Sequence, residues 1–131
     1  MPSTVIDVRT SYTPAQELAI IEAVQSALVQ AFKIPLHDRS IVLTAHLPHR
    51  MITPPALQQP ERYTVVRIDV FAGRTVDAKR QLYQAVVNNL QPLGIPTDHV
   101  LVCLREMPAE NWGLQGGQAA CDVDLGFKIN V

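Results

Sequence analysis

The sequence has few of the residues that mark several large classes of protein. Only two cysteines occur in 131 residues, Cys103 and Cys121, which are too few and too isolated for a disulfide framework or a zinc site. The net charge is −1 and no basic stripe is present, so a nucleic-acid binder is not expected. No apolar run approaches the roughly 20 residues that span a membrane, and the first residues lack the layout of a secretory signal. We therefore expect a cytoplasmic protein that binds neither nucleic acid nor membrane.

Histidine is also sparse, and we expect no metal and no cofactor. Two of the four histidines, His46 and His49, are three residues apart. That spacing needs a helix to converge on one metal, whereas this stretch predicts a strand end and a proline-rich loop. The order of strand, glycine-rich loop and Lys-Ser/Thr that cradles phosphate is missing, and so is a Ser-His-Asp order.

What the chain does contain is an internal repeat with a spacing of about 62 residues. Ile6-Asp7-Val8 recurs as Ile68-Asp69-Val70, and Ile34-Pro35 recurs as Ile95-Pro96. Nearly half of the residues are hydrophobic, which is enough for one apolar core in a chain of this length. The repeat therefore predicts two copies of one structural unit within a single domain.

The predicted domain covers residues 1–131, with copies over about 2–48 and 63–118. A connector rich in proline joins the copies, and a tail over 119–131 follows them. The tail predicts a terminal strand over 124–131, after a glycine-rich turn. Cys103 lies in an apolar run and is expected to be a buried, reduced thiol.

Each copy has a helix-length segment between two strand-like runs. Thr13-Pro14-Ala15-Gln16 has the pattern of a capping box, and apolar residues then recur at helical spacing as far as Phe32. The second helix is predicted to start at Thr75 and to stop at Gly94. Both helices end before an Ile-Pro pair, which cannot continue a helix.

These elements predict an α/β fold built from two strand–helix–strand units. A helical crossover implies parallel pairing within each unit, so two units give a four-stranded mixed sheet with both helices on one face. Along the third strand Val66, Ile68 and Val70 point to one face. The opposite face would carry Val65, Arg67, Asp69 and Phe71. Because that face is half apolar, we expect it to pack against other subunits in a closed oligomer.

Pro2 is the first candidate for chemistry. Removal of Met1 before a small residue would leave a free secondary amine at the start of a core strand. The reference pKa of an α-amino group is about 7.7–8, and burial lowers it, so such an amine can titrate near neutral pH. A general base is most effective with a pKa near the working pH. The alternative is that the chain begins Met-Pro for no chemical reason.

Three further positions could line a site. Arg74 follows Gly73 at the start of the second helix, where a guanidinium beside free N–H groups would hold a carboxylate; the alternative is a surface arginine. Asp38-Arg39 precedes the second strand and could hold a substrate carbonyl, or could be a solvated turn. Trp112 is the only tryptophan, and it would wall a pocket or pack in the core.

Taken together, Pro2, the duplicated unit and Ala72-Gly73-Arg74-Thr75 resemble the tautomerase superfamily, and specifically its longer, duplicated members. The stretch from Pro35 to Arg39 resembles the malonate semialdehyde decarboxylase branch. The resemblance implies a homotrimer without a cofactor, in which Pro2 is the catalytic amine of a site between subunits. It further implies that Arg74 binds the carboxylate of a small acid substrate, Asp38 assists decarboxylation and Trp112 is an aromatic wall.

The resemblance leaves three functions open. The decarboxylase pattern has a second arginine two residues before the one that matches Arg74, and here that position is Ala72; Arg39 and Arg67 are the candidates to replace it. The preferred function is a tautomerase that moves a proton in a small enol or 2-oxo acid, with neutral Pro2 as base. The alternatives are a decarboxylase or hydratase of a 3-oxo acid, and a trimeric binding protein without turnover.

Overall fold

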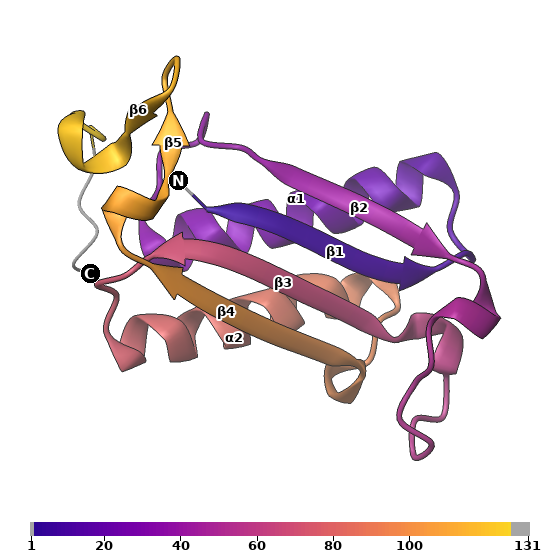
Figure 1. The fold of residues 1–131 in the computed structure, drawn as a ribbon. Coiled ribbons are helices and arrows are strands. Elements are labelled where there is room, and N and C mark those ends of the chain that lie inside the picture. Colours follow the sequence, from indigo (N-terminus) through magenta and orange to yellow (C-terminus); the bar gives the residue numbers. More distant parts are fainter. Residues whose placement is uncertain (1, 127–131) are drawn as a thin grey trace.

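The computed structural model describes residues 2–126. Its main sheet contains β1 (Ser3–Arg9), β2 (Ile41–His46), β3 (Thr64–Phe71) and β4 (Val100–Met107), in the order β2-β1-β3-β4 (Figure 1). β1 pairs with β2 and β3 with β4 in parallel, while the central pair β1 and β3 is antiparallel. The predicted mixed sheet of two strand–helix–strand units is confirmed.

The two helices start where the sequence predicts. In α1 (Pro14–Phe32) the Thr13 hydroxyl accepts from Gln16 N, and the Gln16 side chain accepts from Thr13 N at 2.8 Å, which completes the capping box. In α2 (Val76–Leu90) the N-cap is Thr75. The second helix ends earlier than predicted, because a short 3₁₀ turn over Gln91–Leu93 follows it. Gly94, with a φ of 88°, then ends the helical segment.

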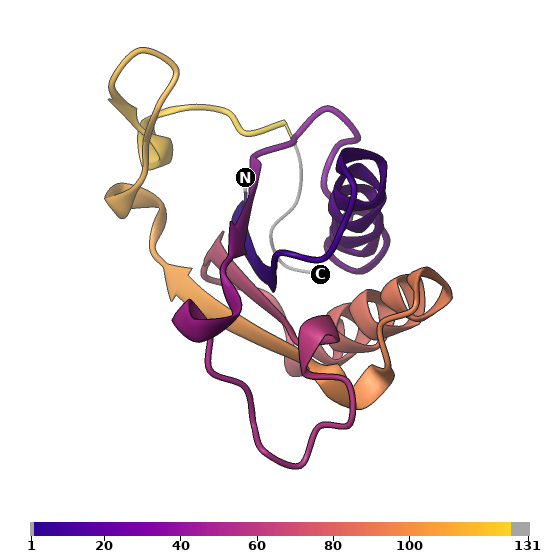
Figure 2. The ribbon, with the colours of Figure 1, turned by 90° about the vertical axis from the view of Figure 1, so that its right-hand side faces the viewer.

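Both helices cover the same face of the sheet (Figure 2), and the core lies between the helices and that face. Even-numbered residues of β1 and β3, such as Ile6 and Val66, are fully buried there against α1 and α2. Neither α1 nor α2 covers the other face, which is only partly shielded among residues 2–126, as where Trp112 packs on Phe71, and we call it the open face. Cys103 lies on it and is exposed, so the expectation of a buried thiol is wrong: alternation along β4 turns this residue away from the helices.

The tail is only partly described. β5 (Gly113–Leu114) and β6 (Gln118–Ala119) form a small hairpin whose turn contains Gly116 and Gly117, both with positive φ. The predicted glycine-rich turn is therefore confirmed. Of the predicted strand over 124–131, residues 124–126 are not in a strand, and residues 127–131 lie outside the described part. No helix within residues 2–126 is long and apolar enough to cross a membrane.

Candidate active site

Pro2 is buried at one end of the sheet, directly before β1. Thr4 N donates to Ser40 O at 2.9 Å, and Ser3 is paired with Asp69 on β3. Continued to Pro2, these registers set it between Arg39, on the β2 side, and Val70, on the β3 side. The loop before β2, the end of β3 and the end of β4 all meet at this end of the sheet.

Arg74 lies in the turn that follows β3, and only 6% of it is exposed. Its guanidinium carbon lies 4.8 Å from the centre of the Phe32 ring, and Nη1 donates to the Phe71 carbonyl at 3.3 Å. Nε and Nη2 are buried and have no hydrogen-bond partner among residues 2–126. The burial excludes the alternative that Arg74 is a surface residue. Two unused donors on a buried cation fit a carboxylate ligand.

Opposing effects act on the Arg74 cation. Burial lowers the pKa of its guanidinium, because a low-polarity surrounding disfavours the charged form, while the charges of Glu106 and Asp38 act in the opposite direction. An arginine nevertheless stays protonated in proteins. The site therefore holds a permanent buried positive charge.

Asp38 lies in the loop before β2, held by its main chain. Its N–H donates to Pro35 O at 3.0 Å, and its carbonyl accepts from Gln25 Nε2 of α1, also at 3.0 Å. Asp38 lines a cavity of about 260 Å³ together with Leu114 and Gln115 of the hairpin. Because its charge also acts on Arg74, the two sequence-predicted residues belong to one electrostatic environment.

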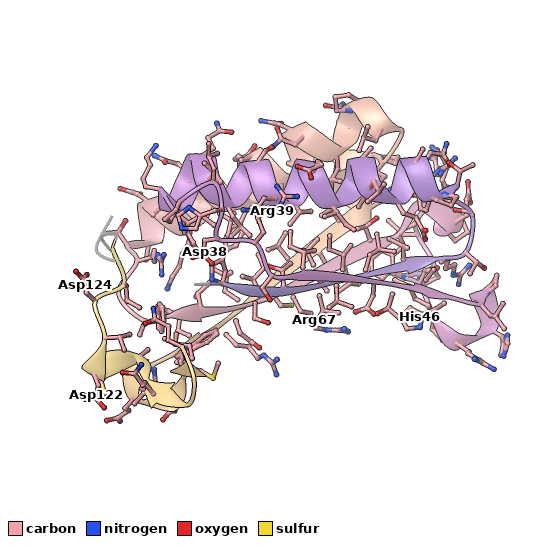
Figure 3. The ribbon with its side chains drawn as sticks, turned by 90° about the horizontal axis from the view of Figure 1, so that it is seen from above. Asp38, Arg39, His46, Arg67, Asp122 and Asp124 are labelled. Atoms are coloured by element: carbon pink, nitrogen blue, oxygen red, sulfur yellow. The ribbon has the colours of Figure 1, made fainter. Side chains whose placement is uncertain are left out.

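Arg39 lines the same cavity as Asp38, but its guanidinium lies at the exposed surface of α1 (Figure 3). Its Nη1 donates to Glu22 Oε2 at 3.2 Å, and Nη2 bonds the other carboxylate oxygen. This contact lowers the pKa of Glu22 and raises that of Arg39. A role for Arg39 in substrate binding would require it to leave Glu22, and that role stays a prediction.

Arg67 lies in the middle of the open face and not at the Pro2 end. It bonds Asp7, whose carboxylate also contacts His46 Nε2 at 2.7 Å, and these residues line a second cavity of about 420 Å³. Asp7 is five strand residues from Pro2, or roughly 16 Å. Within one chain the structure therefore does not bring Arg67 to the Pro2 site.

Trp112 follows β4 at the same end of the sheet as Pro2. Its ring packs against Phe71 with centroids 5.0 Å apart and planes tilted by 56°, and its buried Nε1 has no partner in the described part of the chain. The residue is half-buried, so it is neither a full core residue nor a free surface ring. Phe71 and Phe32 were missed as site residues; alternation along β3 was the only signal available for Phe71.

Acidic, thiol and imidazole groups of the described residues are the candidates for a metal centre. No group of three His, Cys, Asp or Glu side chains within residues 2–126 could hold a metal ion. His99 is buried, with Nδ1 2.7 Å from Asp98 Oδ1 and Nε2 accepting from Gln59 N at 3.1 Å. These contacts tie the proline-rich connector to the start of β4. This is the end of the sheet opposite to the one that carries Arg74, which follows the end of β3.

A family model described as a tautomerase enzyme matches residues 38–115. The chain belongs to this tautomerase family. The resemblance predicted from Pro2, the repeat and the Arg74 turn is thereby confirmed. The matched segment includes Asp38, Arg74 and Trp112, whereas Pro2 lies before it.

Solved structures support the family and its fold. FG41 malonate semialdehyde decarboxylase, inhibited by 3-bromopropiolate, is 34% identical over 89% of this chain and 92% of that one, with a TM-score of 0.76. A second malonate semialdehyde decarboxylase is 23% identical over 93% and 99% of the two chains, with a TM-score of 0.82. A native fused 4-OT is 21% identical over 92% and 98%, also with a TM-score of 0.82. The last two show the shared fold alone.

Proposed function

We propose that the chain is a cofactor-free decarboxylase of a small 3-oxo acid, of which malonate semialdehyde is the simplest, with Pro2 as the catalytic amine. The observation that carries the proposal is the gathering of Asp38 and buried Arg74 at the Pro2 end of the sheet. The 34% identical relative, named as a malonate semialdehyde decarboxylase, supports the same reaction.

The protonation of Pro2 decides between the two chemistries considered from the sequence. A nearby carboxylate favours a protonated amine, and a nearby cation favours a neutral one. Asp38 supplies the first effect and Arg74 the second, and Glu106 is a further carboxylate whose charge acts on Arg74. We therefore infer a protonated Pro2, which acts as an acid, and prefer the decarboxylase over the tautomerase that the sequence favoured.

The reaction then runs through an enol. Arg74 holds the substrate carboxylate in one orientation, and protonated Pro2 donates a hydrogen bond to the 3-oxo oxygen. The bond between C1 and C2 breaks, its electron pair forms the C2–C3 double bond, the 3-oxo oxygen takes the Pro2 proton, and CO₂ leaves. The enol is then protonated at C2 by solvent and returns its hydroxyl proton to Pro2, which gives acetaldehyde from malonate semialdehyde.

We further propose that the chain works as a homotrimer with the open face turned toward its neighbours. Two fused 4-OT relatives, 26% and 20% identical, are named as symmetric and asymmetric trimers. Val42 and Leu101 are large apolar side chains exposed on the open face of the single chain, and burying them would favour association. Light scattering should give three times the mass of the chain; a monomer at micromolar concentration would refute this.

A tautomerase at the same site is the second candidate, favoured by the family description and by the cation at Arg74. The two are compared by assaying CO₂ release from malonate semialdehyde beside ketonisation of phenylenolpyruvate. The sample must begin with Pro2, as checked by intact mass. Faster ketonisation would overturn the decarboxylase proposal, and no turnover of either compound would favour a binding protein.

Asp38→Asn should separate the two chemistries within one protein. Without the carboxylate, Pro2 loses the group that favours its protonated form, so decarboxylation should fall about 100-fold while ketonisation is unchanged or faster. Asp77→Asn makes the same chemical change on an 82% exposed side chain of α2 and should leave both rates unchanged. Equal losses of both activities in Asp38→Asn would contradict the proposed role of this carboxylate.

A further inference from the structure

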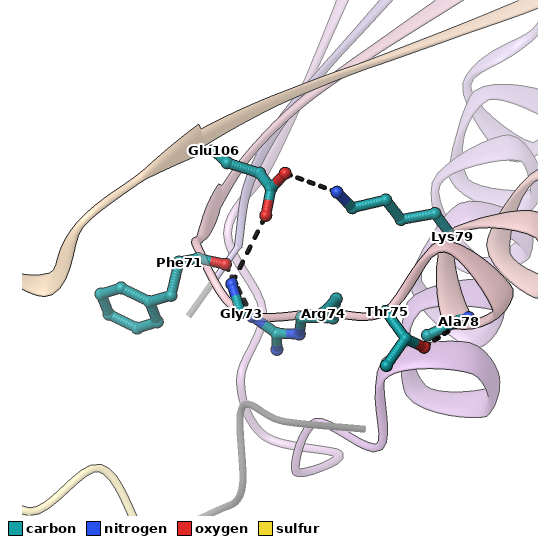
Figure 4. A network of polar contacts seen from close by, with 7 residues as sticks. All are labelled: Phe71, Gly73, Arg74, Thr75, Ala78, Lys79 and Glu106. Atoms are coloured by element: carbon teal, nitrogen blue, oxygen red, sulfur yellow. Dashed lines mark hydrogen bonds and ion pairs between the residues drawn. The ribbon is translucent and has the colours of Figure 1, made fainter.

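The turn that carries Arg74 is fastened by a single side chain from the neighbouring strand. Glu106 lies near the end of β4, and its Oε2 accepts from Gly73 N at 3.4 Å (Figure 4). Its other oxygen, Oε1, bonds Lys79 Nζ of α2. One carboxylate therefore links the end of β4, the β3–α2 turn and the first turns of α2.

The main chain of this turn needs such support. Gly73 has a φ of 131°, a conformation that other residues rarely adopt, so the turn is not held by ordinary backbone preference. Ala72 N donates to Met107 O at 3.0 Å, and the next N–H, that of Gly73, has the Glu106 side chain as its acceptor. Arg74 follows directly, so movement of Gly73 would shift the buried guanidinium.

The charges show that Glu106 is ionised where it performs this role. The bond from Lys79 lowers the pKa of the Glu106 carboxyl, and the Gly73 N–H and the Arg74 charge act in the same direction against partial burial. Of the two carboxylates that favour the charged form of Arg74, Glu106 has the larger effect on its pKa and Asp38 the smaller. Arg74 stays protonated in any case, so Glu106 is not needed to keep the anchor charged.

We propose that Glu106 is a positioning residue, which fixes the Gly73–Arg74 turn so that the free guanidinium donors of Arg74 meet the substrate carboxylate. The inference rests on the proposed role of Arg74 as the carboxylate anchor. Because Glu106 is negative, a purely electrostatic role would weaken the binding of an anion, whereas a positioning role strengthens it. A purely electrostatic role thus predicts no loss of binding when the side chain is shortened with its charge kept, whereas a positioning role predicts a loss.

Two conservative variants separate these roles. Glu106→Gln removes the charge but keeps an oxygen that reaches Gly73 N, while Lys79 can turn to water. Glu106→Asp keeps the charge but is one methylene shorter and cannot span both partners. We expect Glu106→Asp to weaken binding of 3-hydroxypropanoate, an unreactive carboxylate probe, about tenfold. Glu106→Gln should bind it within about twofold of the unsubstituted protein, or more tightly.

Binding is followed by the fluorescence of Trp112, the only tryptophan, whose ring packs on Phe71 near the turn. In turnover of malonate semialdehyde, Glu106→Asp should raise KM by a similar factor with kcat within about twofold, because the variant loses uniform binding and not chemistry. Arg80→Gln is the matched control: Arg80 pairs with Asp77 on the same helix, is 71% exposed and should change neither quantity.

Three results would overturn the proposal: weak binding in Glu106→Gln with normal binding in Glu106→Asp, normal binding in both, or no binding of the probe to the unsubstituted protein. The first would show that binding depends on the charge of Glu106 and not on its reach to Gly73 N. If the unsubstituted protein binds the probe but does not turn over either substrate, the proposed function fails, while the contrast between the two variants still decides the positioning role. Both variants are measured below their melting transitions, so loss of fold cannot imitate loss of affinity.

Discussion

Replacing Pro2 with alanine should lower turnover of the preferred substrate by about a thousandfold, which is the size of a lost general acid or base. Alanine leaves an amine at the same position, but a primary one on a residue without the rigid ring that fixes the nitrogen at the start of β1. The expected loss lies in kcat, because the roles proposed for Arg74 and Trp112 in holding the substrate do not depend on Pro2. Stopped-assay kinetics on both candidate substrates measure it.

The control for this experiment is a change of the next residue. Ser3→Ala keeps the Pro2 amine and the pairing of β1, since Ser3 contributes to the ladder through its main chain. It should retain activity within about twofold, as a substitution away from the reacting atoms. Unchanged turnover in Pro2→Ala, with the first residue verified by intact mass, would remove the proposed mechanism for both the decarboxylase and the tautomerase.

The fold was predictable because its determinants are local. The capping box at Thr13 and the N-cap at Thr75 depend only on residues within one helical turn, and the structure contains both bonds. The repeat added the topology, since two strand–helix–strand units with the same order and spacing of elements allow few sheets. The misplaced end of α2 also has a local cause, as the 3₁₀ turn at Gln91–Leu93 continues the helical spacing that the sequence analysis followed.

The site was predictable only as a set of candidates. Arg74 and Phe32 are distant in sequence, and nothing near Arg74 indicates that an aromatic ring from the end of α1 lies under its guanidinium. The partner of Arg39 was equally hidden, because Glu22 lies on α1, 17 residues earlier in the sequence. Side-chain pairing between elements depends on how these elements pack, and a single sequence carries that information weakly.

Arg74→Met should produce the largest change in affinity. The substitution removes a permanent positive charge at the end of the sheet where Pro2 lies; within residues 2–126, no other arginine or lysine is buried. It also removes two donors that have no partner in the described part of the chain. Charge-assisted, two-point binding of a carboxylate is expected to be lost, and KM should rise about 100-fold. Arg74→Lys keeps the charge but not the planar pair of donors and should recover only part of that loss.

The same substitution should leave the protein as stable as before, or more so. Buried donors without partners cost roughly 1–3 kcal/mol each, and a methionine of similar length would fill the space over Phe32 without them. Against this stands the loss of one weak bond to Phe71 O and of the contact with the Phe32 ring. A thermal melt of the ligand-free protein should therefore show an equal or higher midpoint. A site that keeps a buried cation for binding an anion lowers the stability of the ligand-free protein. A variant that melts several degrees lower while KM is unchanged would mark Arg74 as a structural residue, and the carboxylate anchor would have to be sought elsewhere.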